Sequence, residues 1–140
     1  MAIEIDHLGI AVRSLAEGLR FYEGTLGMAV SRTETIAAEQ VAVAMLPAGV
    51  DSNGPRIELL EATGEASPIA RFIETRGPGL HHIALRVDDL PLVVERLKSE
   101  GARVLNEPQR GAGGHLYVFL HPASAGGVLL ELIQKEPVRD

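Results

Sequence analysis

The chain contains no cysteine and no tryptophan, and only three phenylalanines and two tyrosines among its 140 residues. Without cysteine, disulfide bonds, thiolate metal sites and cysteine nucleophiles are excluded. So few aromatic rings offer no platform for stacking nucleic-acid bases. The formal net charge of −6, with scattered lysine and arginine, also lacks the basic surface that a phosphate backbone requires. We therefore expect no nucleic-acid partner.

Long apolar runs are missing as well. No stretch approaches the roughly 18 consecutive apolar residues that span a membrane. The first predicted strand begins at Ile3, which leaves no room for a signal peptide. We therefore expect a cytoplasmic protein with no membrane association. With 46% hydrophobic and 23% charged residues, the 140-residue chain has the composition of a globular protein with a substantial core.

What the sequence does contain is an internal repeat of a strand that carries a histidine. The segment Ile5–Val12 (IDHLGIAV) resembles Leu80–Val87 (LHHIALRV), and this match aligns His7 with His82. Both segments are apolar, rich in β-branched residues and bounded by turn or helix signals, so both are predicted to be buried strands.

A second repeated strand carries a glutamate. The segment Arg56–Glu61 (RIELLE) resembles Leu129–Gln134 (LLELIQ), and this match aligns Glu58 with Glu131. The spacing from His7 to His82 is nearly the same as the spacing from Glu58 to Glu131. We therefore interpret the chain as a tandem duplication of a unit of about 74 residues.

The apolar pattern predicts the order strand, helix, strand, strand, strand in each copy. A capping box, Ser14–Glu17, begins the first helix, and Gly27 and Gly101 end the two helices at matching positions of the repeat. The predicted strands are Ile3–Val12, Met28–Thr35, Glu39–Pro47, Pro55–Glu61, Leu80–Val87, Arg103–Leu105, His115–His121 and Gly127–Gln134.

The predicted organisation is one domain over residues 1–140. It comprises a βαβββ module at about 3–62, a linker at 63–79 and a second βαβββ module at about 80–135. Ser67 and Pro68 start a short linker helix that ends before Gly77. We expect an α+β fold in which each helix covers one face of a curved mixed sheet.

The two histidines and two glutamates are the candidate metal ligands. A single strand histidine is more often structural, but here it recurs at one repeat position together with a recurrent glutamate. A carboxylate inside an apolar strand is costly to bury unless a metal or a cation compensates it. His7, Glu58, His82 and Glu131 therefore form a nitrogen and oxygen donor set for a divalent metal. His81 should face the opposite side of its strand and is interpreted either as structural or as a residue that supports a metal ligand from behind.

Other polar residues carry weaker signals. From its neighbours alone, Glu39 is an ordinary carboxylate at a strand edge. His115 and His121 lie in or beside the last strands, where a packing role is the default. The glycine-rich segment Gly111–Gly114 could bind phosphate through backbone amides, but no helix clearly follows it.

The chain resembles the vicinal-oxygen-chelate superfamily, which is glyoxalase-like, and within it the methylmalonyl-CoA epimerase family from end to end. The segments that carry this resemblance are Ile5–Val12, which the superfamily shares, and the more specific Ser67–Ile73, Gly79–Ala84 and Phe119–Leu132. Residue by residue, the family's metal ligands fall on His7, Glu58, His82 and Glu131, and some members have glutamine at the position of Glu58. The family's catalytic glutamate falls on Glu39, although the glycine of the family's segment is missing here.

The resemblance implies epimerisation of methylmalonyl-CoA by α-proton abstraction, with a divalent metal stabilising the enolate. Inversion needs two acid/base groups, for which Glu39 and Glu131 are the candidates. Four protein ligands on an octahedral ion leave two positions, which favours Co²⁺, with Mn²⁺, Ni²⁺, Mg²⁺ or Zn²⁺ as alternatives. Arg110 and the Gly111–Gly114 amides are candidates for contacting CoA phosphates, and a homodimer is expected.

Two other functions stay open at this point. One is a lactoylglutathione lyase-like metalloenzyme, because the ligand set alone does not distinguish it from the epimerase. The other is a binding module of the same superfamily that sequesters a small molecule without catalysis. The presence of all four candidate ligands favours an enzyme.

Overall fold

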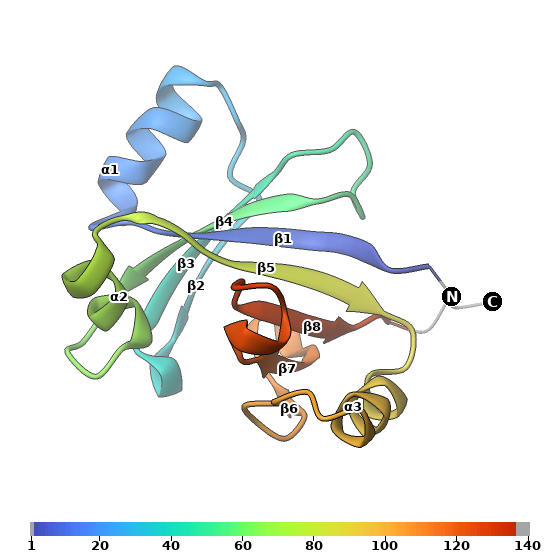
Figure 1. Cartoon of the computed structure of the whole chain (residues 1–140). Coiled ribbons are helices and arrows are strands. Elements are labelled where there is room, and N and C mark those ends of the chain that lie inside the picture. Colours follow the sequence, from blue (N-terminus) through green and yellow to red (C-terminus); the bar gives the residue numbers. More distant parts are fainter. Residues whose placement is uncertain (1, 137–140) are drawn as a thin grey trace. The chain divides into compact units, whose positions relative to one another are not determined.

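Figure 1 shows the computed structural model of the chain, which describes residues 2–136. The residues divide into two units: His7–His81 form one, and residues 2–6 cluster with the chain from His82 onward in the other. Within the described range, no helix is both long and apolar enough to cross a membrane.

The first unit is built on a four-stranded sheet in the order β2-β3-β4-β1. Its strands are β1 (Glu4–Ala11), which enters this unit at His7, β2 (Arg32–Ile36), β3 (Val41–Pro47) and β4 (Arg56–Ala62). β1 runs parallel to β4, whereas β2, β3 and β4 are antiparallel neighbours. The sheet is therefore mixed, as the sequence predicts.

A helix follows β1 where the capping box places it. The Ser14 hydroxyl accepts a hydrogen bond from the Glu17 amide at the start of α1 (Leu15–Leu19), and Gly27 ends the segment with φ 80°. After Leu19 the chain continues as a π-helix over Arg20–Thr25. The spacing of Leu15, Leu19, Tyr22 and Leu26 predicts one apolar stripe, but the wider turn changes the phase of the side chains and leaves Leu26 57% exposed.

The two faces of this sheet are covered by different helices. On one face Leu15, Leu19 and Tyr22 pack with the fully buried Leu46 and Leu59. The other face packs against α2 (Pro68–Arg76), the predicted linker helix, capped by Ser67. The residues of that second cluster are Ala11, Val41, Val43, Met45, Leu60, Ile69, Phe72 and Ile73.

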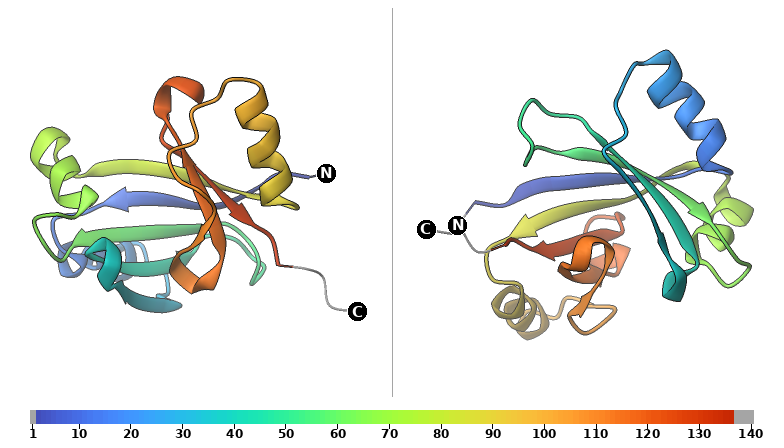
Figure 2. Two further views of the ribbon diagram at one scale, coloured as in Figure 1. Left: turned by 90° about the horizontal axis from the view of Figure 1, so that it is seen from below. Right: turned by 180° about the vertical axis from the view of Figure 1, so that it is seen from behind.

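The second unit repeats the topology of the first. Its elements are β5 (Gly79–Val87), α3 (Leu90–Ser99), β6 (Gln109–Arg110), β7 (Leu116–Leu120) and β8 (Leu130–Gln134). The strand order is β5-β8-β7-β6, and β5 is parallel to β8 as β1 is to β4. Figure 2 shows α3 beside the strands of its own unit, where it packs in the cluster of Val87, Val118 and Leu132.

The packing confirms the repeat independently of the sequence match. Leu59 and Leu132 occupy equivalent repeat positions, and they sit on the sheet faces that α1 and α3 cover. Because strand side chains alternate, the neighbouring Glu58 and Glu131 are turned to the opposite faces. In each copy the glutamate therefore lies on the face that the repeated helix does not cover.

Several predicted strands are shorter or absent. The strands predicted at Met28–Thr35 and Gly127–Gln134 begin only at Arg32 and Leu130. Glu39 does not begin β3, because Ala37–Glu39 form a 3-10 turn and the ladder between β2 and β3 closes at Ile36 and Val41. In place of a strand at Arg103–Leu105 there is a single bridge from Val104 to Leu120. There the Arg103 amide donates its hydrogen bond to the Ser124 hydroxyl and not to a neighbouring strand.

Candidate metal centre and active site

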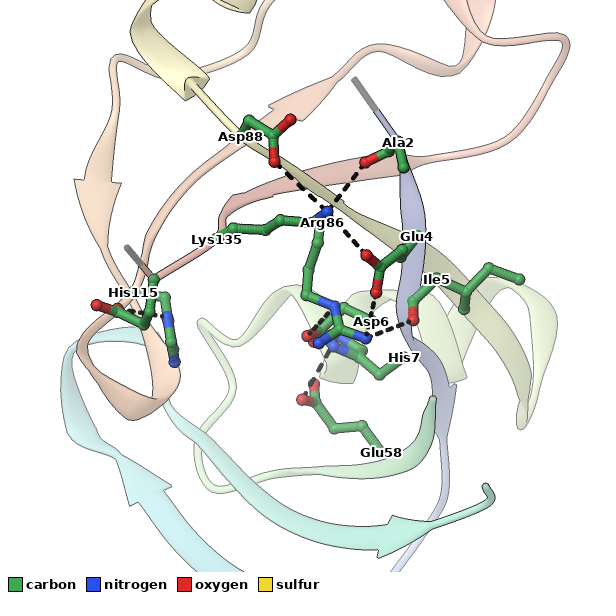
Figure 3. A network of polar contacts seen from close by, with 11 residues as sticks. Ala2, Glu4, Ile5, Asp6, His7, Glu58, Arg86, Asp88, His115 and Lys135 are labelled. Carbon is green, nitrogen blue, oxygen red and sulfur yellow. Dashed lines mark hydrogen bonds and ion pairs between the residues drawn. The ribbon is translucent and has the colours of Figure 1, made fainter. Parts of the chain in front are cut away.

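The first histidine–glutamate pair lies on the parallel strands β1 and β4. Gly9 is the register partner of Glu58, so His7, two residues before Gly9, is on the same face as that glutamate. The His7 Nε2 and Glu58 Oε2 atoms are 3.5 Å apart, and their side chains are 4% and 7% exposed (Figure 3). An imidazole and a carboxylate are thereby held together out of contact with solvent.

The second pair has the same construction. Ala84 is the register partner of Glu131, and His82 lies two residues before Ala84. The His82 Nε2 and Glu131 Oε1 atoms are 3.2 Å apart, with side chains 5% and 13% exposed. In both units the glutamate is thus opposite the residue two positions after the histidine, on the parallel neighbouring strand.

The chemistry of these pairs fits a divalent metal. Each offers an imidazole nitrogen and a carboxylate oxygen, which are ligands that Zn²⁺, Co²⁺, Ni²⁺ and Mn²⁺ accept in proteins. Glu58 is only 5% exposed on its strand, where an uncompensated carboxylate would be costly. Repetition of such a pair in both units is expected for a metal site and not for two unrelated core contacts.

An aromatic residue that the sequence analysis did not select supports the second pair. Phe119 is the register partner of Glu131, and its ring meets the His82 ring edge-on with centroids 5.7 Å apart. Tyr117 in turn contacts Phe119 at 5.6 Å. Phe119 could have been selected from the internal repeat. Met45 occupies the equivalent position of the first copy, and it is the register partner of Glu58 as Phe119 is of Glu131.

The neighbouring histidine has a different environment. The His81 ring contacts the Phe72 ring of α2, with centroids 5.0 Å apart. Adjacent side chains of β5 thus have different partners, Phe72 for His81 and Glu131 for His82. This packing agrees with a structural part for His81.

Glu39 lies in the loop between β2 and β3. It is the last residue of the 3-10 turn and is partly buried, and Gln40 after it has a left-handed backbone with φ 53°. Its position therefore depends on the conformation of the turn and not on pairing in the sheet.

The segment before His7 is anchored within the second unit by two cations (Figure 3). Arg86 forms ion pairs with Asp6 at 3.4 Å and Glu4 at 3.6 Å and donates a hydrogen bond to the Ile5 carbonyl. Lys135 donates to Glu4 at 2.8 Å and to the carbonyl of Ala2 at 3.0 Å. The hydrogen bond from Lys135 lowers the pKa of the Glu4 carboxyl, and the same bond raises the pKa of Lys135.

The glycine-rich loop uses several of its polar groups internally. The Gly111 amide donates to the His115 carbonyl, and the Gly114 amide donates to the Gly111 carbonyl. The Arg110 guanidinium donates to the Gly114 carbonyl at 2.6 Å. These bonds leave fewer amides for a phosphate than the sequence alone would offer.

The two remaining histidines have local partners. His115 Nδ1 lies 3.0 Å from a Glu136 carboxylate oxygen. His121 Nδ1 accepts a hydrogen bond from the Ala123 amide and so caps a short 3-10 turn. These contacts give both residues a structural part.

The comparisons with known proteins agree with this architecture. Residues 6–119 match the family model of the glyoxalase/bleomycin resistance protein/dioxygenase superfamily. The chain belongs to this superfamily.

Several similar proteins are named as epimerases of acyl-CoA substrates, and two others, at 28% and 29% identity, as probable lactoylglutathione lyases. The chain is 39% identical to an ethylmalonyl-CoA/methylmalonyl-CoA epimerase of Cereibacter sphaeroides, over 93% of this chain and 96% of the relative. It is 37% identical to the mitochondrial methylmalonyl-CoA epimerase of Homo sapiens, over 93% of this chain and 73% of the relative.

A solved structure gives the same result for the fold. A variant of the Streptomyces coelicolor methylmalonyl-CoA epimerase, in complex with 2-nitronate-propionyl-CoA, matches with a TM-score of 0.88 at 37% identity. The match covers 96% of this chain and 98% of that structure's chain. The α+β fold predicted from the duplicated modules is therefore confirmed.

Proposed function

We propose that this chain is a metal-dependent epimerase that interconverts the (R) and (S) epimers of methylmalonyl-CoA. The observation that carries the proposal is the duplicated register of His7 with Glu58 and of His82 with Glu131. Relatives at 37% and 39% identity that are named as epimerases of methylmalonyl-CoA support the choice of substrate.

The proposed metal ligands are His7, Glu58, His82 and Glu131, so that the two modules act as one domain. When bound, a divalent ion supplies positive charge that stabilises the enolate as it develops. Co²⁺ is our first choice of ion. Four protein ligands would fill a tetrahedral ion, but they leave two positions of an octahedral ion open for the substrate.

The protein's own groups would then move the proton. The α-hydrogen of the substrate is acidified by the thioester carbonyl, and inversion requires its removal on one face and its return on the other. We assign one of these transfers to the Glu39 carboxylate. We assign the second proton transfer to Glu131, which would also be a metal ligand.

The cellular setting follows from the same proposal. A CoA thioester is a small soluble metabolite, so we propose a cytoplasmic enzyme that works as a homodimer. Arg110, whose guanidinium is exposed, remains the candidate for contacting the phosphates of CoA.

The test is to incubate the metal-loaded protein with one epimer of methylmalonyl-CoA in D₂O. NMR should show both inversion and incorporation of deuterium at the α-carbon. The hemithioacetal of glutathione and methylglyoxal should not be turned over. Production of lactoylglutathione with no action on the CoA thioester would instead favour the lyase, and a metal-free protein that binds without turnover would favour the binding module.

A further inference from the structure

Among residues 2–136, Gln40 is the one residue other than glycine that has a positive φ, with φ 53° and ψ 50°. This left-handed conformation crowds the β-carbon of an L-residue, and glycine usually occupies it. Residues held in such conformations concentrate at active sites. Gln40 directly follows Glu39, the proposed acid/base group.

The second copy of the repeat has glycine at the position that corresponds to Gln40. Counting back along the chain from the equivalent residues Met45 and Phe119 pairs Gln40 with Gly114, in the loop between β6 and β7. Gly114 has φ 78°. The loop between β6 and β7 has two left-handed residues, Gly113 and Gly114, and glycine occupies both positions without strain. A glutamine at the strained position of the first copy implies that its side chain has a use.

The side chain of Gln40 lies where Gly64 leaves room for it. A β-carbon built on Gly64 would overlap Gln40 Oε1 and come within 2.8 Å of its Cδ. Gly64 does not have a left-handed backbone, so its conformation does not require glycine. The missing side chain at Gly64 is thus explained by the amide of Gln40.

The backbone of Gln40 is also held on both sides. Its amide donates to the Ala37 carbonyl at 3.2 Å, and its carbonyl accepts from the Thr63 amide at 2.8 Å. Glu39 lies inside the loop, beyond the closing pair Ile36 and Val41. The carboxylate of Glu39 is therefore placed by this turn and by what holds the turn.

We propose that Gln40, seated over Gly64, is a positioning residue that fixes the Glu39 carboxylate for proton transfer. The inference rests on the proposed function, in which Glu39 is an acid/base group. Proton transfer is sensitive to placement, and a displacement of about 1 Å can cost on the order of 10²-fold in rate. The amide of Gln40 takes no proton itself.

The experiment compares Gly64→Ala with the control Gly24→Ala. Gly64→Ala pushes the end of a flexible side chain aside, so the protein should fold and keep its metal. We expect kcat for inversion of methylmalonyl-CoA to fall about ten- to a hundred-fold, with KM within about twofold. Gly24 also lacks a positive φ, and its nearest contact would be 4.0 Å, so Gly24→Ala should behave as wild type.

A second variant separates positioning from a general structural effect. Gln40→Gly keeps the left-handed turn but removes the side chain, so it should lose a similar factor in kcat with no loss in Tm. Adding Gly64→Ala to Gln40→Gly should cause no further loss, because the two changes remove the same contact. Additive losses would overturn the proposed contact.

Exchange measured separately for the two substrate epimers distinguishes a failure of this inference from a failure of the proposed function. Glu39→Gln should abolish exchange of the α-hydrogen with D₂O for one epimer of methylmalonyl-CoA, and Gly64→Ala should slow exchange for that same epimer only. Wild-type kcat in Gly64→Ala, with an asymmetric loss in Glu39→Gln, overturns the positioning role and leaves the proposed function intact. Undiminished inversion in Glu39→Gln overturns both.

Discussion

Replacing His7 or His82 by alanine should remove the stabilisation that a bound metal gives. At a free metal concentration about one hundred times the dissociation constant, binding stabilises a folded protein by about 2.7 kcal/mol. A chain of this size gains about 4 °C in Tm per kcal/mol, so the expected rise for the wild type is about 10 °C. Loss of one ligand should weaken metal binding at least about 100-fold, since even outer-shell changes cost about 10- to 100-fold. The same metal concentration then adds only about 0.4 kcal/mol, or about 2 °C.

The assay is the rise in Tm on adding Co²⁺ to metal-free protein, read by calorimetry, with metal content measured in parallel. Each variant is compared with its own metal-free form. The stability that the substitution itself costs, by removing the imidazole beside Glu58 or Glu131, therefore does not affect the measured rise in Tm. Because the two pairs share register and both histidines are buried, both alanine variants should lose the rise to a similar extent. His81→Ala, whose ring contacts Phe72, should keep it. A His82→Ala protein that still gains about 10 °C would refute a site built from both pairs.

Three further changes test other parts of the reasoning. Glu39→Gln should retain metal and keep KM within a few-fold, while inversion falls by about 10²–10⁴ and one epimer still exchanges its α-hydrogen with D₂O. Lys135→Met should lower Tm at pH 7. Because the folded state lowers the pKa of Glu4, this contribution is present above the ordinary pKa of 4.5 and is lost as pH falls through the folded value, so the Tm difference should shrink toward pH 3. Leu59→Ala, at a fully buried position, should cost about 2–5 kcal/mol in urea unfolding with no loss of metal.

The duplication made most of the fold and the two histidine–glutamate pairs predictable. The two repeated segments align strands as well as candidate ligands at nearly equal spacing, and the capped helix ends at Gly27 and Gly101 lie in the predicted places. These features are local patterns with a fixed period, which a sequence displays directly. The register of Glu58 opposite Gly9 depends on how β1 and β4 pair, which the sequence does not specify.

The parts that could not be predicted depend on contacts between distant residues. No glycine in the sequence marks the left-handed turn at Gln40. The Gln40 carbonyl accepts a hydrogen bond from Thr63, and the Gln40 side chain lies over Gly64, and both of these residues come after two further strands of the chain. The π-helical continuation of α1 is likewise not visible in a pattern read with the α-helical period. Tertiary contacts selected these conformations over the simpler local alternatives.

The two copies differ at the position of Glu39, the proposed acid/base group. The candidate ligands repeat in both, but counting back from the equivalent residues Met45 and Phe119 places Gly113, which has no side chain, at the position of Glu39. A duplicated ligand set therefore does not bring a duplicated base. The second proton-transfer group has to come from a position that is not equivalent to Glu39, which is why we assign it to Glu131. Two unlike groups acting on opposite faces of one enolate also explain why the loss of Glu39 should affect the two substrate epimers unequally.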